Sequence, residues 1–208
     1  MNEYIYKLDN FLFPLISNIE RPNILELGVQ QGISTVKFLQ ICNKNDGFLF
    51  SVDVEDYSKI TNDKKWKFIK SRDDNFEYIK SLIPKQIDVL YIDSLHEAKH
   101  VQNIIYNYYD IIKVGGYLFI DDISHLPYLD KKKTSFYCEI NNKETFEMLL
   151  SIFYFNQNSF DINFSFKSSG LCIIKKKSDD SLKKNEPLKS RKNSLKNILR
   201  KTWMKFKK

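Results

Sequence analysis

The segment DVLYIDSLHEAKHVQNIIYNYYDIIKVGGYLFIDDIS (residues 88–124) contains the pattern that decides the fold. Its two short apolar runs, 88–93 and 117–121, are typical of buried strands. Residues 97–113, between them, have the apolar spacing of an amphipathic helix, which the following glycines end. A strand, a helix and a second strand in this order predict two parallel, neighbouring strands.

The same alternation extends to both sides of this segment. The remaining strands are predicted at 23–28, 48–53, 67–71, 160–166 and 171–176, and the remaining helices at 33–44, 74–83 and 144–155. In the helix at 33–44, Val36, Leu39 and Ile41 are expected to face inward. The last two strands flank the tight turn KSSG and form a hairpin, so the final strand should be antiparallel to the others. The predicted fold class is α/β: a Rossmann-like, doubly wound, mostly parallel seven-stranded sheet with a C-terminal antiparallel hairpin.

Length and charge divide the 208 residues into a body and a tail. We expect one domain over 1–177, with an N-terminal helix or cap at 1–20, and a basic tail over 178–208. From Lys175 onward there are 14 Lys and Arg against 3 Asp and Glu, whereas the preceding residues have 19 against 23. The excess positive charge therefore lies in the tail, while a nucleic-acid enzyme more often has its basic patch on the body. Three isolated cysteines, no signal-peptide pattern and no long apolar run predict a cytoplasmic protein.

A glycine-bracketed turn follows the first predicted strand, in LELGVQQGIS (25–34). Glu26 closes the strand, Gly28 and Gly32 bracket the turn, and Ser34 opens the next helix. Glycines let the backbone approach a ligand closely, and the N–H groups at a helix start favour an anionic group. Asp53, at the end of the second strand, can accept hydrogen bonds from a ribose diol. This pattern indicates a cofactor that carries adenosine and an anionic group, although such turns also occur in other α/β proteins.

The glycine spacing separates two classes of cofactor. A dinucleotide-binding loop has the form G-x-G-x-x-G, but Gln30 stands where its middle glycine would be. The loop instead resembles motif I of class I S-adenosylmethionine-dependent methyltransferases, in the form E-x-G-x-x-x-G-x-S. The chain order and the closing hairpin are also similar to that superfamily. In that superfamily, the residues at the positions of Ser71, Arg72 and Asp73 contact the adenine of the cofactor. Arg72 can alternatively pair with a neighbouring acid.

The segment 88–124 resembles a narrower group, the small metal-dependent O-methyltransferases of macrocin and catechol type, which act on hydroxyl groups of sugars, glycosides and related compounds. The resemblance covers roughly residues 20–125, and it implies that Asp93, Asp121 and Asp122 hold Mg²⁺ or another divalent cation. Three carboxylates at neighbouring strand ends would repel one another without a cation, and oxygen ligands suit Mg²⁺. The alternative is that these acids only cap the segments that follow them.

His96, three residues after Asp93, is the predicted general base, since an imidazole can accept a hydroxyl proton near pH 7. Catechol-type relatives have a lysine at that position, so this role is an inference from the residue itself. The alternative is a histidine at the helix start that binds water or a phosphate. His100 is expected to face solvent. His125, just after the acid pair, is a candidate for substrate contact. The polar stretch 124–143, interpreted as a loop or lid, and the first 20 residues are expected to shape the acceptor pocket.

These features predict a Mg-assisted O-methyltransferase that uses S-adenosylmethionine and acts on a sugar, glycoside or lipid-linked saccharide. Two alternatives are an RNA methyltransferase that uses the basic tail and a non-catalytic binding protein with the same fold. The residues SLKNILRKTWMKFKK (194–208) predict a basic amphipathic helix, with Lys196, Arg200, Lys207 and Lys208 on or near its polar side. Such a helix is suited to an anionic membrane surface. The alternative is a disordered solubilising tail or one that packs on a partner.

Overall fold

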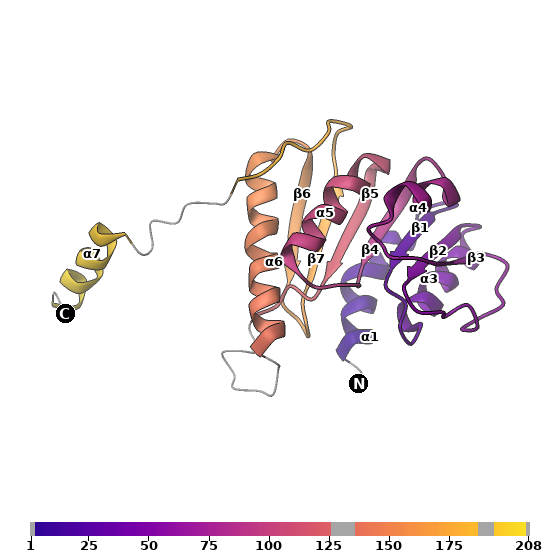
Figure 1. Ribbon diagram of the computed structural model, residues 1–208, viewed down its shortest axis with the longest axis horizontal. Helices are drawn as coiled ribbons and strands as arrows, with labels where there is room; N and C mark the ends of the chain where they lie inside the picture. The colour runs from indigo at the N-terminus through magenta and orange to yellow at the C-terminus, as the bar shows by residue number, and fades with distance from the viewer. Residues whose placement is uncertain (1–2, 126–135, 187–193, 207–208) are drawn as a thin grey trace.

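The protein folds around a seven-stranded sheet, seen in a computed structural model that describes residues 3–125, 136–186 and 194–206 (Figure 1). The strands are β1 (Asn23–Leu27), β2 (Phe48–Asp53), β3 (Trp66–Lys70), β4 (Ile87–Ile92), β5 (Ile112–Asp121), β6 (Phe160–Ser165) and β7 (Leu171–Lys176). They lie in the order β3-β2-β1-β4-β5-β7-β6. Neighbours from β3 to β5 are parallel, whereas β7 is antiparallel to both β5 and β6. The predicted fold class is confirmed.

Helices cover both faces of the sheet. They are α1 (Glu3–Lys7), the π-helical turn η1 (Leu8–Leu12), α2 (Phe13–Ile16), α3 (Ile33–Lys44), α4 (Phe76–Leu82), α5 (Ala98–Tyr108), the 3-10 turn η2 (Tyr109–Ile111), α6 (Phe136–Phe155) and α7 (Leu195–Phe206). Buried side chains of α4, α5 and α6 form one apolar cluster with the sheet. Side chains of η1, α2 and α3 form a second cluster on the opposite face.

The central strand β4 shows why both faces are apolar. Leu90 and Ile92 belong to the first cluster, whereas Val89 and Tyr91 belong to the second. Successive side chains of a strand point to opposite faces, so a strand covered on both sides is apolar throughout. β4 also lies at the centre of the strand order, so its end is in the middle of the sheet edge that forms the site.

The structure corrects two predicted helices. α6 begins at Phe136 rather than at residue 144, so part of the stretch expected to be a loop is helical, while residues 126–135 lie outside the described part of the chain. The polar start of α6 is buried, and the side-chain amide of Asn142 donates a hydrogen bond to the carbonyl of Ser124 at 2.8 Å. Because buried polar side chains of this kind can form hydrogen bonds within the protein, the buried start of α6 does not show an apolar pattern in the sequence. The helix expected at 97–113 ends at Tyr108, and β5 already begins at Ile112.

One inward position of α3 is also corrected. Leu39 and Ile41 are buried as expected, but Val36 is 47% exposed. The inward stripe of α3 instead contains Thr35 and Cys42. Thr35 and Cys42 lie about two helical turns apart on the face that packs against the sheet, whereas Val36 points away from that face.

Candidate active site

A pocket of about 780 Å³ opens at the carboxyl ends of the five parallel strands β1 to β5. This is the sheet edge at which open parallel sheets bind their ligands. The predicted site residues that line it are Gly28, Ser34, Asp53, Ser71, Asp73, Asp93, His96, Asp121 and Asp122. Glu26 and Gly32 are outside this lining. The tertiary structure thus brings residues from five strand ends into one cavity.

Gly28 forms the turn after β1 under a tight steric constraint. Its φ of +96° lies in the left-handed region, and a Cβ at this position would stand 2.1 Å from the carbonyl oxygen of Asp93. Only glycine allows β1 and β4 to end so close together. Any larger residue would therefore disturb the strand ends as well as the pocket.

Glu26 lies beneath the pocket, fully buried. Its carboxylate accepts hydrogen bonds from the hydroxyls of Ser34 at 2.5 Å, Thr35 at 2.8 Å and Ser51 at 2.6 Å. Burial raises the pKa of Glu26 to about 7, although the three hydroxyl hydrogen bonds act in the opposite direction. Glu26 therefore joins β1, β2 and the start of α3 from below. Gly32, which also lies outside the pocket lining, is the N-cap of α3 and has a φ of +72°.

Asp53 holds the loop after β1 from the neighbouring strand. Its carboxylate accepts hydrogen bonds from the backbone N–H groups of Val29 at 2.8 Å, Gln30 at 3.4 Å and Glu55 at 3.0 Å. Gln30 has a positive φ of 46°, which turns the loop back toward β2. The acid predicted for a ribose thus also orders the wall of the pocket.

Asp73 forms a second polar centre with His100. Asp73 Oδ2 accepts hydrogen bonds from Ser94 Oγ at 2.5 Å and from His100 Nε2 at 2.9 Å. The His100 side chain is only 9% exposed, so the expectation that it faces solvent is wrong. Its hydrogen bond to Asp73 raises the pKa of His100, and burial opposes that rise. Burial also acts to raise the pKa of Asp73, but the hydrogen bonds from His100 and Ser94 outweigh it and keep that pKa low.

Arg72 and His125, two other polar residues named from the sequence, contact neighbouring side chains. The Arg72 guanidinium donates to both carboxylate oxygens of Asp74, at 2.9 and 2.7 Å, on the surface. His125 packs against the rings of Phe146 and Phe166, and its Nδ1 has no hydrogen-bond partner among the described residues. His125 is not part of the pocket lining, so the structure does not place it where a pocket-bound acceptor would contact it.

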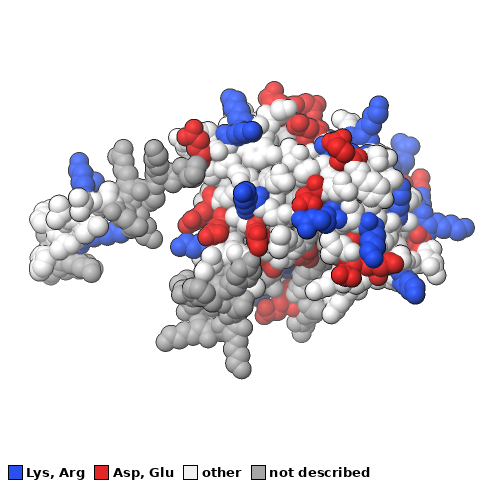
Figure 2. All heavy atoms as spheres, viewed as in Figure 1, with Lys and Arg blue, Asp and Glu red and all other residues white. Residues whose placement is uncertain are grey.

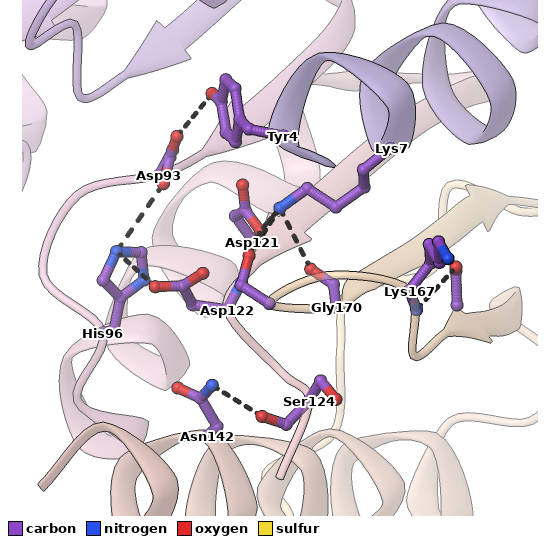
Figure 3. Close-up of polar contacts among 12 residues, drawn as sticks. Tyr4, Lys7, Asp93, His96, Asp121, Asp122, Ser124, Asn142, Lys167 and Gly170 are labelled. Atoms are coloured by element: carbon purple, nitrogen blue, oxygen red, sulfur yellow. Dashed lines mark hydrogen bonds and ion pairs between the residues drawn. The ribbon is translucent and has the colours of Figure 1, made fainter. Parts of the chain in front are cut away.

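The three acids expected to bind metal converge at the ends of β4 and β5. These strands are neighbours, with Ile92 paired to Ile120, so Asp93 and Asp121 follow at the same edge. His96 lies between Asp93 and Asp122, with its Nε2 3.6 Å from Asp93 Oδ1 and 3.3 Å from Asp122 Oδ2 (Figure 3). Burial, followed by repulsion from Asp121, raises the pKa of Asp93 well above its usual range.

Sequence reasoning missed two residues of this acidic edge, Tyr4 and Lys7 of α1. The Tyr4 hydroxyl donates to Asp93 Oδ2 at 2.8 Å and lies 3.0 Å from the Tyr91 hydroxyl. Lys7 is fully buried, and its ammonium forms an ion pair with Asp121 (Figure 3). Polar residues three positions apart, before the apolar Leu8, were the available signal, because they lie on one helical face.

The acidic edge, as arranged here, does not fit the predicted Mg²⁺ site. Asp121 Oδ1 accepts from Lys7 Nζ, from Ser169 Oγ at 3.2 Å and from the Asp122 N–H at 2.6 Å, and Oδ2 accepts from the Tyr91 hydroxyl at 2.9 Å. Within residues 3–125, 136–186 and 194–206, no group of three or more His, Cys, Asp or Glu is arranged to hold a metal ion. Both oxygens of the Asp121 carboxylate are therefore engaged by protein donors.

A comparison with protein-family models matches residues 25–123 to a model described as a methyltransferase domain. This match and the fold support the expectation of a methyltransferase. A search of curated proteins found no match.

Several solved structures share the fold at low sequence identity. The MycE methyltransferase of the mycinamycin biosynthetic pathway, solved with Mg and SAH, is 17% identical, with a TM-score of 0.61. The match covers 85% of this chain and 50% of MycE, so the chain spans half the length of that protein. A proposed caffeoyl-CoA O-methyltransferase from Staphylococcus aureus is 19% identical (TM-score 0.62; 85% of this chain, 84% of that one). A proposed rRNA methylase from Clostridium thermocellum is 14% identical (TM-score 0.63; 86% and 97%).

Proposed function

We propose that the protein transfers the methyl group of S-adenosylmethionine to a hydroxyl oxygen of a sugar, glycoside or lipid-linked saccharide. The observation that carries this proposal is the position of His96, which lines the same pocket as the Gly28 turn. The methyltransferase domain and fold support methyl transfer. The acceptor class rests on the resemblance of residues 88–124 to O-methyltransferases that act on glycosides.

In this proposal the cofactor lies along the β1 and β2 ends. The N–H groups of the turn at Gly28 and the start of α3 at Ser34 bind its carboxylate, and Asp53 accepts the ribose hydroxyls. Ser71 and Asp73 flank the adenine. Glu26 and Gly32 contribute from behind the pocket, because Glu26 sets the position of Ser34 through their 2.5 Å hydrogen bond.

The reaction is an in-line displacement. The acceptor oxygen forms a bond to the methyl carbon while the bond from that carbon to the sulfonium sulfur breaks, and S-adenosylhomocysteine leaves with the electron pair. The acceptor hydroxyl proton passes to the imidazole of His96, whose Nε2 faces Asp93 and Asp122 at 3.6 and 3.3 Å. Their carboxylates stabilise the imidazolium that forms. Holding acceptor and cofactor in line within one pocket supplies much of the acceleration.

Mg²⁺ assistance, which the sequence predicts at Asp93, Asp121 and Asp122, enters no step of this mechanism, because the donor set around Asp121 does not fit the ion. A pocket of about 780 Å³ has the size of a small-molecule site, which favours a small-molecule acceptor. Figure 2 shows acidic and basic side chains interspersed over the visible face of the body, which offers a nucleic acid no continuous basic surface there.

The proposal is tested by transfer of tritiated methyl groups from S-adenosylmethionine to a panel of nucleotide sugars, glycosides, glycolipids and RNA. We expect label on a saccharide hydroxyl and none on RNA. Labelling of RNA alone would replace this proposal with the nucleic-acid alternative. Cofactor binding without labelling of any acceptor class would contradict the acceptor proposal, and failure to bind the cofactor would favour a non-catalytic protein.

We also propose that α7 holds the enzyme at an anionic membrane surface, where a lipid-linked acceptor would be found. No helix of the described residues is both long and apolar enough to span a membrane. Large apolar side chains of α7 are nevertheless exposed, among them Leu195 at 80%, Leu199 at 69% and Trp203 at 59%. Lys196, Arg200 and Lys201 add positive charge on the same short helix, which complements anionic lipids. Lys207 and Lys208, also predicted to contribute, lie outside the described residues.

Co-sedimentation with phosphatidylglycerol vesicles tests this role of the tail. The full chain should pellet at low salt and less at high salt, whereas a truncation after Lys177 should stay in the supernatant. Vesicles of phosphatidylcholine are the matched control for charge. If the full chain and the truncation distribute alike, the tail does not bind membranes.

A further inference from the structure

The deepest charged group of the site is the ammonium of Lys7, on the N-terminal helix. The side chain is fully buried at the end of β5, beside acids predicted to bind a metal (Figure 3). A buried ammonium is costly unless an opposite charge and hydrogen-bond acceptors compensate it. The surroundings of Lys7 therefore show which group of this edge it neutralises.

Each proton of the Lys7 ammonium has an acceptor. One points to Asp121 Oδ1, one to Ser169 Oγ at 2.8 Å and one to the carbonyl of Gly170 at 3.5 Å. Asp121 is itself almost fully buried, with 1% of its side chain exposed. Ser169 donates in turn to Asp121 Oδ1 at 3.2 Å, which closes the network. The pair is thus a complete, buried unit made from α1, β5 and the turn before β7.

This unit engages the carboxylate of Asp121, one of the three that the predicted metal site would need. Mg²⁺ requires about six oxygen ligands near 2.1 Å, and a carboxylate at the end of β5 would have to turn a lone pair toward it. Asp121 Oδ1 directs its lone pairs to Lys7, Ser169 and the Asp122 N–H, and the Tyr91 hydroxyl takes Oδ2. An ammonium and a metal ion cannot share Oδ1 on this side, because they repel each other and overlap.

We propose that the ammonium of Lys7 is the resident cation of this acidic edge, in the place expected for a metal ion, and that methyl transfer here requires no divalent cation. The second half rests on the proposed function. Lys7 is not part of the pocket lining, so it is a positioning residue: it neutralises Asp121 and fixes α1 against β5. Tyr4 is about one helical turn before Lys7 on α1. With α1 held against β5, the Tyr4 hydroxyl donates to Asp93 at the pocket wall.

Binding of Mn²⁺, followed by electron paramagnetic resonance of the free ion, tests the proposal without any activity assay. The wild-type protein should bind no stoichiometric Mn²⁺. Lys7→Ala releases Asp121 Oδ1 and leaves space, so it should bind one Mn²⁺ at least tenfold more tightly than the wild type does. The double variant Lys7→Ala, Asp121→Asn should lose this acquired binding, which would locate the ion at Asp121.

Lys37→Ala is the matched control, because it removes an exposed ion pair between α3 and Asp9 of the same N-terminal segment. It should leave Mn²⁺ binding at the wild-type level. Circular dichroism establishes that each variant is folded, and Lys7→Ser, which also leaves space beside Asp121, replaces the alanine variant if that one is not folded. A role of Lys7 in stability alone would lower the melting temperature without creating a metal site.

Two results would overturn the proposal. One is stoichiometric Mn²⁺ binding by the wild type that Asp121→Asn abolishes, and the other is a folded Lys7→Ala or Lys7→Ser protein that gains no Mn²⁺ affinity. Wild-type methyl transfer should also be unchanged in EDTA. If no acceptor is found, that assay fails together with the proposed function, whereas the Mn²⁺ measurements still decide the identity of the cation.

Discussion

The two halves of the pocket are built in different ways. In the cofactor half, Glu26 bonds to Ser34 and Ser51, and Asp53 bonds to Val29, so these partners around the first turn are at most 25 residues apart. In the acidic half, Lys7 pairs with Asp121 across 114 residues, and Tyr4 reaches Asp93 across 89. Local turn chemistry therefore shapes the first half, and packing of the N-terminal helix completes the second. Variants that affect one half and spare the other test this division.

The largest effect is expected from His96→Gln in the acidic half. Loss of the general base should lower kcat by about 10²–10⁴-fold, with an unchanged dissociation constant for S-adenosylmethionine. Steady-state kinetics and calorimetry on the same preparation measure the two quantities. A variant with full kcat would remove His96 from the mechanism, and one with weakened cofactor binding would show that the halves are not separate.

Glu26→Gln examines the buried acid under the cofactor half through the pH dependence of stability. Since burial raises the pKa of Glu26 to about 7, the folded state binds a proton more readily than the unfolded state does. Stability from this group is present at low pH and is lost as the pH rises from about 4.5 to 7. The loss should be on the order of 2–3 kcal/mol in the wild type and absent in the variant.

Urea unfolding at pH 5 and pH 8 measures this difference for Glu26→Gln. The exposed Glu20, replaced by Gln, is the matched control and should leave the wild-type dependence unchanged. Parallel pH profiles for the wild type and Glu26→Gln would contradict a raised pKa at this position.

Asp53→Ala should weaken cofactor binding by about tenfold, because the N–H groups of Val29 and Gln30 lose their acceptor. The residual kcat at saturating cofactor should stay close to that of the wild type. Glu55→Ala, an exposed acid in the same loop, is the control and should bind the cofactor normally. Equal affinities in the two variants would show that Asp53 does not organise the loop.

The smallest effect is expected for Tyr4→Phe, which removes one hydroxyl from the acidic half. Asp93 Oδ2 retains the Tyr91 hydroxyl at 3.1 Å, so the variant should remain folded. We expect kcat/KM for the acceptor to fall by about threefold to tenfold, in line with the loss of one hydrogen bond, and the cofactor affinity to be unchanged. An effect on the cofactor alone would place Tyr4 in the other half.

The sheet was predictable because its strands are covered on both faces. Residues 87–92 are all buried, and within them 89–92 form a continuous apolar run in the sequence. Helix α6 was predicted eight residues too short, since Glu139, Asn141 and Asn142 near its start are polar yet buried. Such residues are satisfied by partners elsewhere in the chain, as the hydrogen bond from Asn142 to Ser124 illustrates, and a single sequence does not show those partners.

By itself, the sequence determined which acids would meet at one edge of the sheet. Asp53, Asp93 and Asp121 each follow an apolar run, and parallel strands with helices between them end on the same side. Only the tertiary structure decided what neutralises those acids. The ammonium of Lys7 reaches Asp121 because η1 and α2 pack their apolar residues into the cluster behind β4, which holds α1 beside the end of β5. Local spacing can place charges along an edge, but the partner of a buried charge depends on contacts between segments far apart in the chain.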